Sequence, residues 1–163
     1  MRAMDVLERL RQLSPGTANL LLSAALPRII PAAGGLGLKV EEVSDTRAHI
    51  SVPLKRRTKN HVGALYFGVQ MTAAELTAGL WLLRRFPPNA YRSLVKRVEA
   101  DFRSQGRGKV YALCEPPAEV FSALEGALRQ KGDKAEAWLP VKLLAEDGTV
   151  VTEVRFLDAV KKL

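Results

Sequence analysis

A single carboxylate stands in the most apolar helical segment of the chain. Residues 64–86 contain no proline and suffice for about six turns of helix, and Glu75 is their only acidic residue. Its neighbours are apolar or small, and burial of a charged group among them costs free energy unless a partner or a cleft compensates. Glu75 is therefore the first candidate for a catalytic acid or base. The alternative is a structural role, in which Glu75 pairs with an arginine or reaches solvent at the edge of the helix.

Small residues share the helix face of Glu75. Gly68, Thr72, Glu75 and Gly79 are spaced by four, three and four residues, which places them along one side of a helix. A stripe of small side chains lets another backbone or a ligand approach closely. We therefore expect substrate contacts at Gly68 and Thr72, next to the carboxylate.

The loop before the helix is suited to hold a carbonyl oxygen. The first backbone N–H groups of a helix are unpaired and favour negative charge, and Asn60 adds a side-chain amide close by. Gly63 and Gly68 flank the point where the helix begins. Asn also favours caps and turns, so a purely structural role for Asn60 stays open. No Ser or Cys nucleophile with a partner motif accompanies His61, which makes catalysis by this histidine the weaker hypothesis.

Composition indicates one globular domain. A length of 163 residues fits a single core, and 47% hydrophobic with 26% charged residues is typical of a soluble protein. The apolar stretch 20–30 is too short to span a bilayer and does not resemble a signal peptide, so we expect a cytoplasmic protein without membrane contact. Cys114 is the only cysteine and the two histidines stand far apart, which predicts no intramolecular disulfide, no metal and no other cofactor.

The chain is basic, with a net charge of +8 and a pI near 9.9. Basic surfaces attract polyphosphates, but the positive residues are spread along the chain and no nucleic-acid-binding motif accompanies them. We therefore expect no nucleic-acid partner. The charge also suits a small molecule that carries phosphates, such as coenzyme A. Candidates for such contacts lie near predicted strand or loop ends: Arg56, Arg57, Lys59 and Arg103.

The order of elements predicts an α+β fold in which an antiparallel sheet wraps around one long helix. Residues 1–35 are interpreted as a helical lead-in and residues 36–163 as the core of a single domain, 1–163. Alternating apolar residues predict strands, and an amphipathic segment near 117–130 predicts a helical insertion between two of them. The predicted strands span 38–43, 47–54, 91–102, 108–115, 134–144 and 150–160.

The motif residues resemble those of the hotdog-fold thioesterases, in particular the phenylacetyl-CoA and 4-hydroxybenzoyl-CoA thioesterase-like branch. That family has a loop Asn, a His-Gly-Gly triplet and a helix carboxylate. Asn60 and Glu75 have the family's spacing of fifteen residues, and Gly68 falls on the second glycine of the triplet. Tyr66 and Phe67 stand where the family has His and Gly. The segment is more similar still to an uncharacterised hotdog subgroup.

The resemblance implies a site at the interface of a homodimer, or of a tetramer built from dimers. Asn60 and the backbone at Phe67 or Gly68 would hold a thioester carbonyl, and Glu75 of the other subunit would activate water or attack directly. Tyr66 would donate a hydrogen bond in place of the missing His, or it would only pack. Ser93, on the next predicted strand, is a further candidate for contact with water.

The predicted function is hydrolysis of an acyl-CoA or a related thioester. A non-catalytic acyl-CoA-binding protein is the alternative, because the His-Gly-Gly triplet is absent. A hotdog dehydratase is a third reading, although such enzymes pair a catalytic His with a carboxylate and His61 is poorly placed for that role. A basic nucleic-acid-binding module is the last.

Overall fold

The computed structural model describes residues 13–130 and 132–163. Its helices and strands follow the predicted order, with a short 3-10 turn between the first helix and the first strand. The elements are α2 (Pro15–Ile29), η1 (Pro31–Ala33), β1 (Lys39–Val43), β2 (Ala48–Val52), α3 (Phe67–Arg85), β3 (Tyr91–Phe102), β4 (Val110–Cys114), α4 (Glu119–Gln130), β5 (Lys134–Ala145) and β6 (Val150–Lys162).

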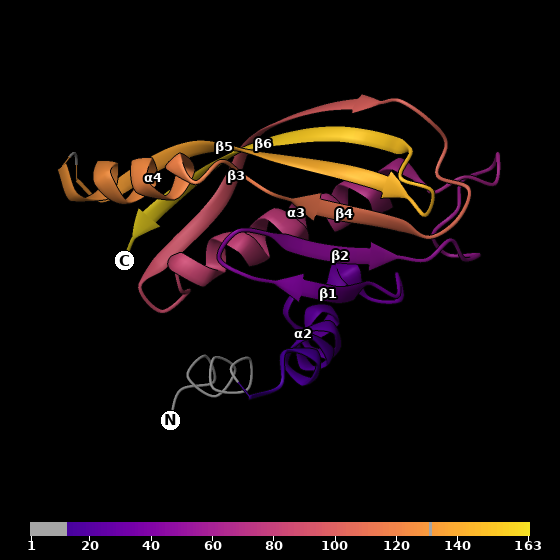
Figure 1. Cartoon of the computed structure of the whole chain (residues 1–163), viewed down its shortest axis with the longest axis horizontal. Helices are drawn as coiled ribbons and strands as arrows, with labels where there is room; N and C mark the ends of the chain where they lie inside the picture. The colour runs from indigo at the N-terminus through magenta and orange to yellow at the C-terminus, as the bar shows by residue number, and fades with distance from the viewer. Residues whose placement is uncertain (1–12, 131) are drawn as a thin grey trace.

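The strands form one six-stranded antiparallel sheet in the order β1-β2-β4-β5-β6-β3. The sheet curves around α3, which crosses its inner face (Figure 1). Helix α3 contacts β2, β4, β5 and β6. This is the α+β hotdog fold, so the predicted architecture is confirmed.

Helix α3 is central because most of its surface is apolar. Ala73, Ala74 and Trp81 are at most 1% exposed, and they meet the inward-facing residues of the strands. On β2 those residues are Ala48, Ile50 and Val52, all fully buried as the alternating pattern predicted. The buried helix and the inner face of the sheet therefore form one continuous core.

A buried glutamine fixes the start of α3. The Gln70 side chain donates a hydrogen bond from Nε2 to the Leu65 carbonyl, at 2.9 Å. Its Oε1 accepts a hydrogen bond from the Thr152 hydroxyl of β6. The Leu65 amide in turn donates to the Gly106 carbonyl, at 2.8 Å. One side chain thus ties the helix to the loop before it and to the sheet.

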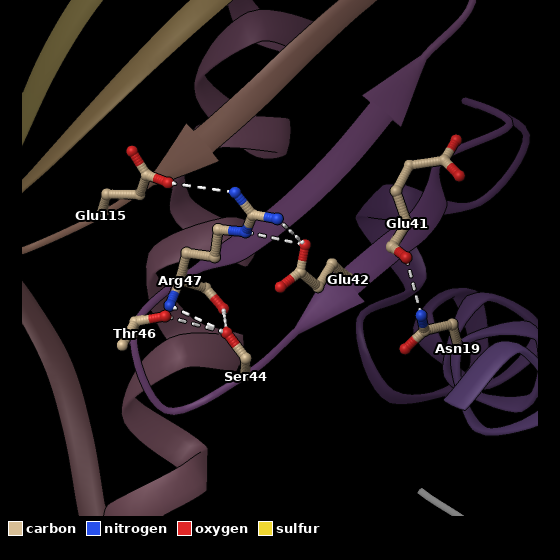
Figure 2. Close-up of polar contacts among 7 residues, drawn as sticks. All are labelled: Asn19, Glu41, Glu42, Ser44, Thr46, Arg47 and Glu115. Carbon is tan, nitrogen blue, oxygen red and sulfur yellow. Dashed lines mark hydrogen bonds and ion pairs between the residues drawn. The ribbon is translucent and has the colours of Figure 1, made fainter. Parts of the chain in front are cut away.

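Helix α2 lies along the outer edge of β1. Asn19 donates from Nδ2 to the Glu41 carbonyl at 2.7 Å (Figure 2), and the Val40 amide donates to the Ser23 hydroxyl at 2.8 Å. Two backbone groups of this edge strand therefore bond to side chains of α2.

The turn after β1 is held by charge. Arg47 lies between Glu42 at the end of β1, with Nη2 at 2.6 Å, and Glu115 just after β4, with Nη1 at 3.6 Å (Figure 2). The Ser44 amide donates to the Arg47 carbonyl at 2.8 Å. The short turn predicted at residues 44 and 45 is thus confirmed, and Arg47 links it to a neighbouring strand.

Two predicted helix limits were wrong. Helix α3 begins at Phe67 rather than at residue 64, because the Leu65 amide is used by Gly106. Pro27 and Pro31 in the sequence predict that the preceding helix ends near residue 26, but helix α2 continues through Pro27 to Ile29. A proline so close to the end of a helix removes only one of its last hydrogen bonds. The first twelve residues of the predicted lead-in lie outside the described residues. No helix in the described part of the chain is both long and apolar enough to span a bilayer.

The Gln70 clamp predicts a specific effect of substitution. Gln70→Leu should lower the free energy of unfolding by about 1–3 kcal/mol, because the buried Leu65 carbonyl and Thr152 hydroxyl lose their partner. Urea denaturation followed by circular dichroism measures this loss. The control is the double variant Gln70→Leu with Thr152→Val, which removes both side chains of the Gln70–Thr152 hydrogen bond. Its loss in the free energy of unfolding should be smaller than the sum of the losses in the two single variants. Additive losses would contradict the clamp.

Candidate functional site

Asn60 forms a tight turn beside the start of α3. Its Oδ1 accepts hydrogen bonds from the Val62 and Ala64 amides, at 3.1 and 3.0 Å. Gly63 completes the turn with a φ of +79°, a conformation that glycine adopts without strain. The turn role left open for Asn60 is therefore real. The oxygen is thus committed to the turn, and the described residues provide no acceptor for the Nδ2 group.

The first amides of α3 are open. The amides of Val69 and Gln70 donate to the Tyr66 carbonyl, whereas those of Phe67 and Gly68 have no acceptor among the residues that the structure describes. The Tyr66 ring lies over Gly68, where an added Cβ would come within 2.8 Å of it. Gly68 therefore permits a close approach, and the structure gathers Asn60, Gly63, Tyr66, Phe67 and Gly68 around one helix N-terminus.

The stripe of small residues occupies the part of α3 that the sheet leaves partly uncovered. Gly68, Thr72, Glu75 and Gly79 are all half-buried. The Thr72 hydroxyl donates to the Gly68 carbonyl at 2.8 Å, so only its oxygen lone pairs are available to a ligand. The predicted stripe is thus confirmed as a face, and Glu75 is its only charged residue.

Glu75 lies on the wall of an apolar cavity of about 380 Å³ between α2, α3 and the start of β3. Most of the lining is leucine and isoleucine. Ser93 of β3, the candidate for contact with water, lines the same cavity. The lining residues are Leu22, Leu26, Ile29, Ile30, Glu75, Leu76, Gly79, Leu80, Leu83, Arg84, Pro88 and Ser93.

A second carboxylate lies near Glu75 and was missed in the sequence. Asp158 of β6 is 6% exposed and lies on the strand face that holds the buried Phe156 and Val160. It pairs with Val95 across the β3–β6 ladder, two residues from Ser93. The signal was present, because Asp158 interrupts the apolar face of a predicted alternating strand.

The two carboxylates influence each other. Burial raises the pKa of Glu75 above its ordinary value. Burial and, to a lesser extent, the negative charge of Glu75 raise the pKa of Asp158 to about 6. Neither group has a hydrogen bond or ion pair within the described residues. Both carboxylates therefore take up a proton at a higher pH than an exposed carboxylate does.

One protomer does not bring Asn60 and Glu75 together. Glu75 follows the first residue of α3 by eight positions, which corresponds to about 12 Å along a helix axis. The Asn60 turn lies beside the first residue of α3, which is the far end of this segment from Glu75. A carbonyl held at the helix N-terminus is therefore out of reach of Glu75 in the same chain.

The predicted phosphate contacts are only partly gathered. Arg56, Arg57 and Lys59 are exposed on the loop before Asn60, although the Arg57 guanidinium lies against Gly35. Arg103 follows β3 and forms ion pairs with Asp101 and Glu153, each at 3.1 Å. Arg56 and Lys59 are thus the better-placed cations beside the helix N-terminus.

The remaining chemical candidates are structural or isolated. Cys114 is fully buried, and desolvation raises the pKa of its thiol well above the ordinary value. The alternation of His49 with Ala48 and Ile50 predicts a place on the strand surface. His49 is instead half-buried against Tyr111, with 5.4 Å between ring centroids, and burial lowers its pKa. His61 is exposed on the Asn60 turn. Within residues 13–130 and 132–163, His, Cys, Asp and Glu form no group of three or more that could hold a metal ion.

A family model described as a domain of unknown function, DUF4442, matches residues 18–158. The chain belongs to the DUF4442 family. None of the curated proteins matches its sequence. Among solved structures, it is similar to a Pseudomonas aeruginosa protein of unknown function named a probable thioesterase, with a TM-score of 0.79 and 26% identity over 88% of this chain and 95% of that one.

Two other solved structures of bacterial proteins share this fold. A Chlorobaculum tepidum protein of unknown function has a TM-score of 0.77 and 18% identity, over 91% of this chain and 97% of that one. A Haemophilus influenzae thioesterase has a TM-score of 0.70 and 16% identity, over 89% of this chain and 91% of that one. These similarities to solved structures establish that the DUF4442 chain has the hotdog fold.

The buried carboxylate of Asp158 predicts a pH-dependent stability. Its pKa in the folded protein, about 6, exceeds the ordinary value, so its ionisation destabilises the fold as the pH rises from about 4 to 6. Asp158→Asn removes this ionisation. The free energy of unfolding of the variant, relative to wild type, should increase by about 2–3 kcal/mol between pH 4 and pH 7.

Urea titrations at several pH values measure this difference. Asp147→Asn is the control of opposite sign, because the hydrogen bond from the Thr149 amide lowers the pKa of Asp147. Its stability relative to wild type should decrease as the pH rises through the acidic range. A pH-independent difference for Asp158→Asn would contradict the assignment of a raised pKa.

Proposed function

We propose that this DUF4442 protein is a homodimeric hydrolase of acyl-CoA thioesters, with each site built from two subunits. The observation that carries the proposal is Glu75, a carboxylate with no partner in the described chain, on the wall of an apolar cavity. A buried charge without compensation is costly, and such groups are concentrated at functional sites. Two of the structures that share the fold are named thioesterases, one of them as a probable one.

Two subunits are needed because one protomer separates the required groups. The donors lie at the N-terminus of α3, and the base lies about 12 Å further along the helix. A partner related by a two-fold axis would place its Asn60 loop beside Glu75 of the first subunit, and the reverse contact would follow from the symmetry.

The edge strand β3 supports a dimer. Within the part of the chain that the structure describes, it pairs only with β6. It exposes apolar side chains: Leu94 is 65%, Val98 45% and Phe102 53% exposed. Phe102 also contacts Phe67 at the start of α3, with 6.4 Å between ring centroids. An edge of this kind is a template for pairing with another strand. The apolar surface thus continues from β3 to the donor loop, which is where the proposed partner would join.

The proposed chemistry is attack of water on the thioester carbonyl carbon. Glu75 accepts a proton from the water as the new C–O bond forms. The Phe67 and Gly68 amides and Asn60 Nδ2 of the partner subunit stabilise the oxyanion. The C–S bond then breaks, the acid is released, and the thiolate of coenzyme A takes up a proton. In this proposal Arg56 and Lys59, which are exposed on the loop before Asn60, bind the phosphates of the coenzyme.

The role of Glu75 is tested by Glu75→Gln, which removes the base and keeps the size of the side chain. We expect kcat/KM to fall by about 10²–10⁴-fold, measured as release of free thiol from a panel of acyl-CoA thioesters. Glu119→Gln on the exposed start of α4 is the matched control and should keep wild-type activity. Thermal stabilisation of the wild type by acyl-CoA without any thiol release would instead select a binding protein.

The two-subunit site predicts complementation between inactive variants. Asn60→Ala and Glu75→Gln should each be inactive alone. When the two are unfolded together and refolded as a mixture, one site of each heterodimer combines an intact Asn60 with an intact Glu75. With random pairing of the subunits, about one quarter of all sites in the mixture are then intact. The mixture should therefore show about one quarter of the activity of the wild-type protein. A mixture as inactive as its components would refute a shared site.

A further inference from the structure

The cavity beside Glu75 has walls that indicate what it holds. Its apolar lining comes from two helices: Leu22, Leu26 and Ile29 of α2 face Leu76, Leu80 and Leu83 of α3. Among the described residues, no aromatic ring lines it, and the polar residues of its lining are Glu75, Arg84 and Ser93. Such walls suit a flexible aliphatic chain rather than an aromatic ring, which is commonly bound by other rings.

We propose that the substrates are thioesters of linear, medium-chain aliphatic acids, with the chain between α2 and α3 and the carbonyl beside Glu75. This inference rests on the proposed function and names its substrate class. The volume of about 380 Å³ sets the length. Because a methylene group occupies about the space of one water molecule in the liquid, roughly 30 Å³, the cavity holds on the order of ten such groups.

Gly79 leaves space in the cavity for the acyl chain. Glycine in the middle of a helix costs about 1 kcal/mol relative to alanine, yet no neighbour requires it here, because an added Cβ at Gly79 would meet nothing within 4 Å. That open space is the cavity, which Gly79 lines. A larger side chain at this position would extend into the volume assigned to the acyl chain. Gly79 therefore keeps the cavity open one helical turn from the carboxylate.

Helix α2 is a fixed wall rather than a loose cover. Two hydrogen bonds hold it against β1: Asn19 donates to the Glu41 carbonyl, and the Ser23 hydroxyl accepts from the Val40 amide. Leu26 is 5% exposed and belongs to the core, whereas Ile29 is 68% exposed at the mouth. The depth of the cavity is thus set by the position of α2, and the proposal predicts a length limit.

The test combines binding and hydrolysis over the same chain lengths. S-alkyl coenzyme A thioethers with four to sixteen carbons, which cannot be hydrolysed, are titrated by calorimetry, and thiol release is measured with the matching acyl-CoA thioesters. For wild type we expect affinity to rise about three- to fourfold per methylene until about ten carbons, and then to level off. Phenylacetyl-CoA and benzoyl-CoA should be poorer substrates than decanoyl-CoA.

Gly79→Leu is the filling variant. Its side chain should shorten the preferred acyl chain by about four carbons, the size of the group added, while the melting temperature stays equal or rises. Gly126→Leu is the matched control, because Gly126 lies within α4 and an added Cβ there also meets nothing within 4 Å. This control should keep the wild-type length preference.

The outcomes separate the two hypotheses. A length limit that moves in Gly79→Leu and not in Gly126→Leu supports the chain cavity. Affinity independent of length, a preference for the aromatic thioesters, or an unchanged limit in Gly79→Leu overturns it. Length-dependent binding of the thioethers without thiol release from any thioester supports the cavity and refutes the proposed hydrolase.

Discussion

The structure depends on the enclosure of one long helix by a curved sheet. Helix α3 has no continuous polar side, so its burial is the main hydrophobic contribution to the fold. The sheet covers most of its circumference and leaves one strip, where the side chains are small and Glu75 is the only charged group. The location of the candidate site follows from this geometry, because the uncovered strip is the place where a ligand or another subunit can reach the helix.

The same enclosure brings a second carboxylate close to the first. A strand that contributes its inner face to the core normally presents apolar residues there, and β6 does so except at Asp158. Burial disfavours the charged form of both acids, so the pKa values of Glu75 and Asp158 are raised. Burial of the two carboxylates destabilises the folded core. The hydrogen bonds of Gln70 fix the start of α3, so the position of its first amides does not depend on these carboxylates.

Much of this fold could be predicted from the sequence, because its elements have strong periodicity and clear stops. The strand at 91–102 was placed with the limits that the structure gives, and the proline pair after Phe86 ended the central helix. Glu75 was recognisable as an acid among apolar neighbours. The start of α3 was misplaced because a long-range bond from Leu65 to Gly106 decides it. Asp158 was missed because its proximity to Glu75 depends on how β6 packs against the helix.

The two edges of the sheet are treated differently. At β1, side chains of α2 occupy backbone groups that would otherwise face outward, whereas β3 keeps its outer edge open. Growth of a sheet into a fibre requires two free edges on every molecule, one for each neighbour. A molecule with a single free edge can only form a pair and then stop. Helix α2 thus covers part of one of the two edges that growth into a fibre requires.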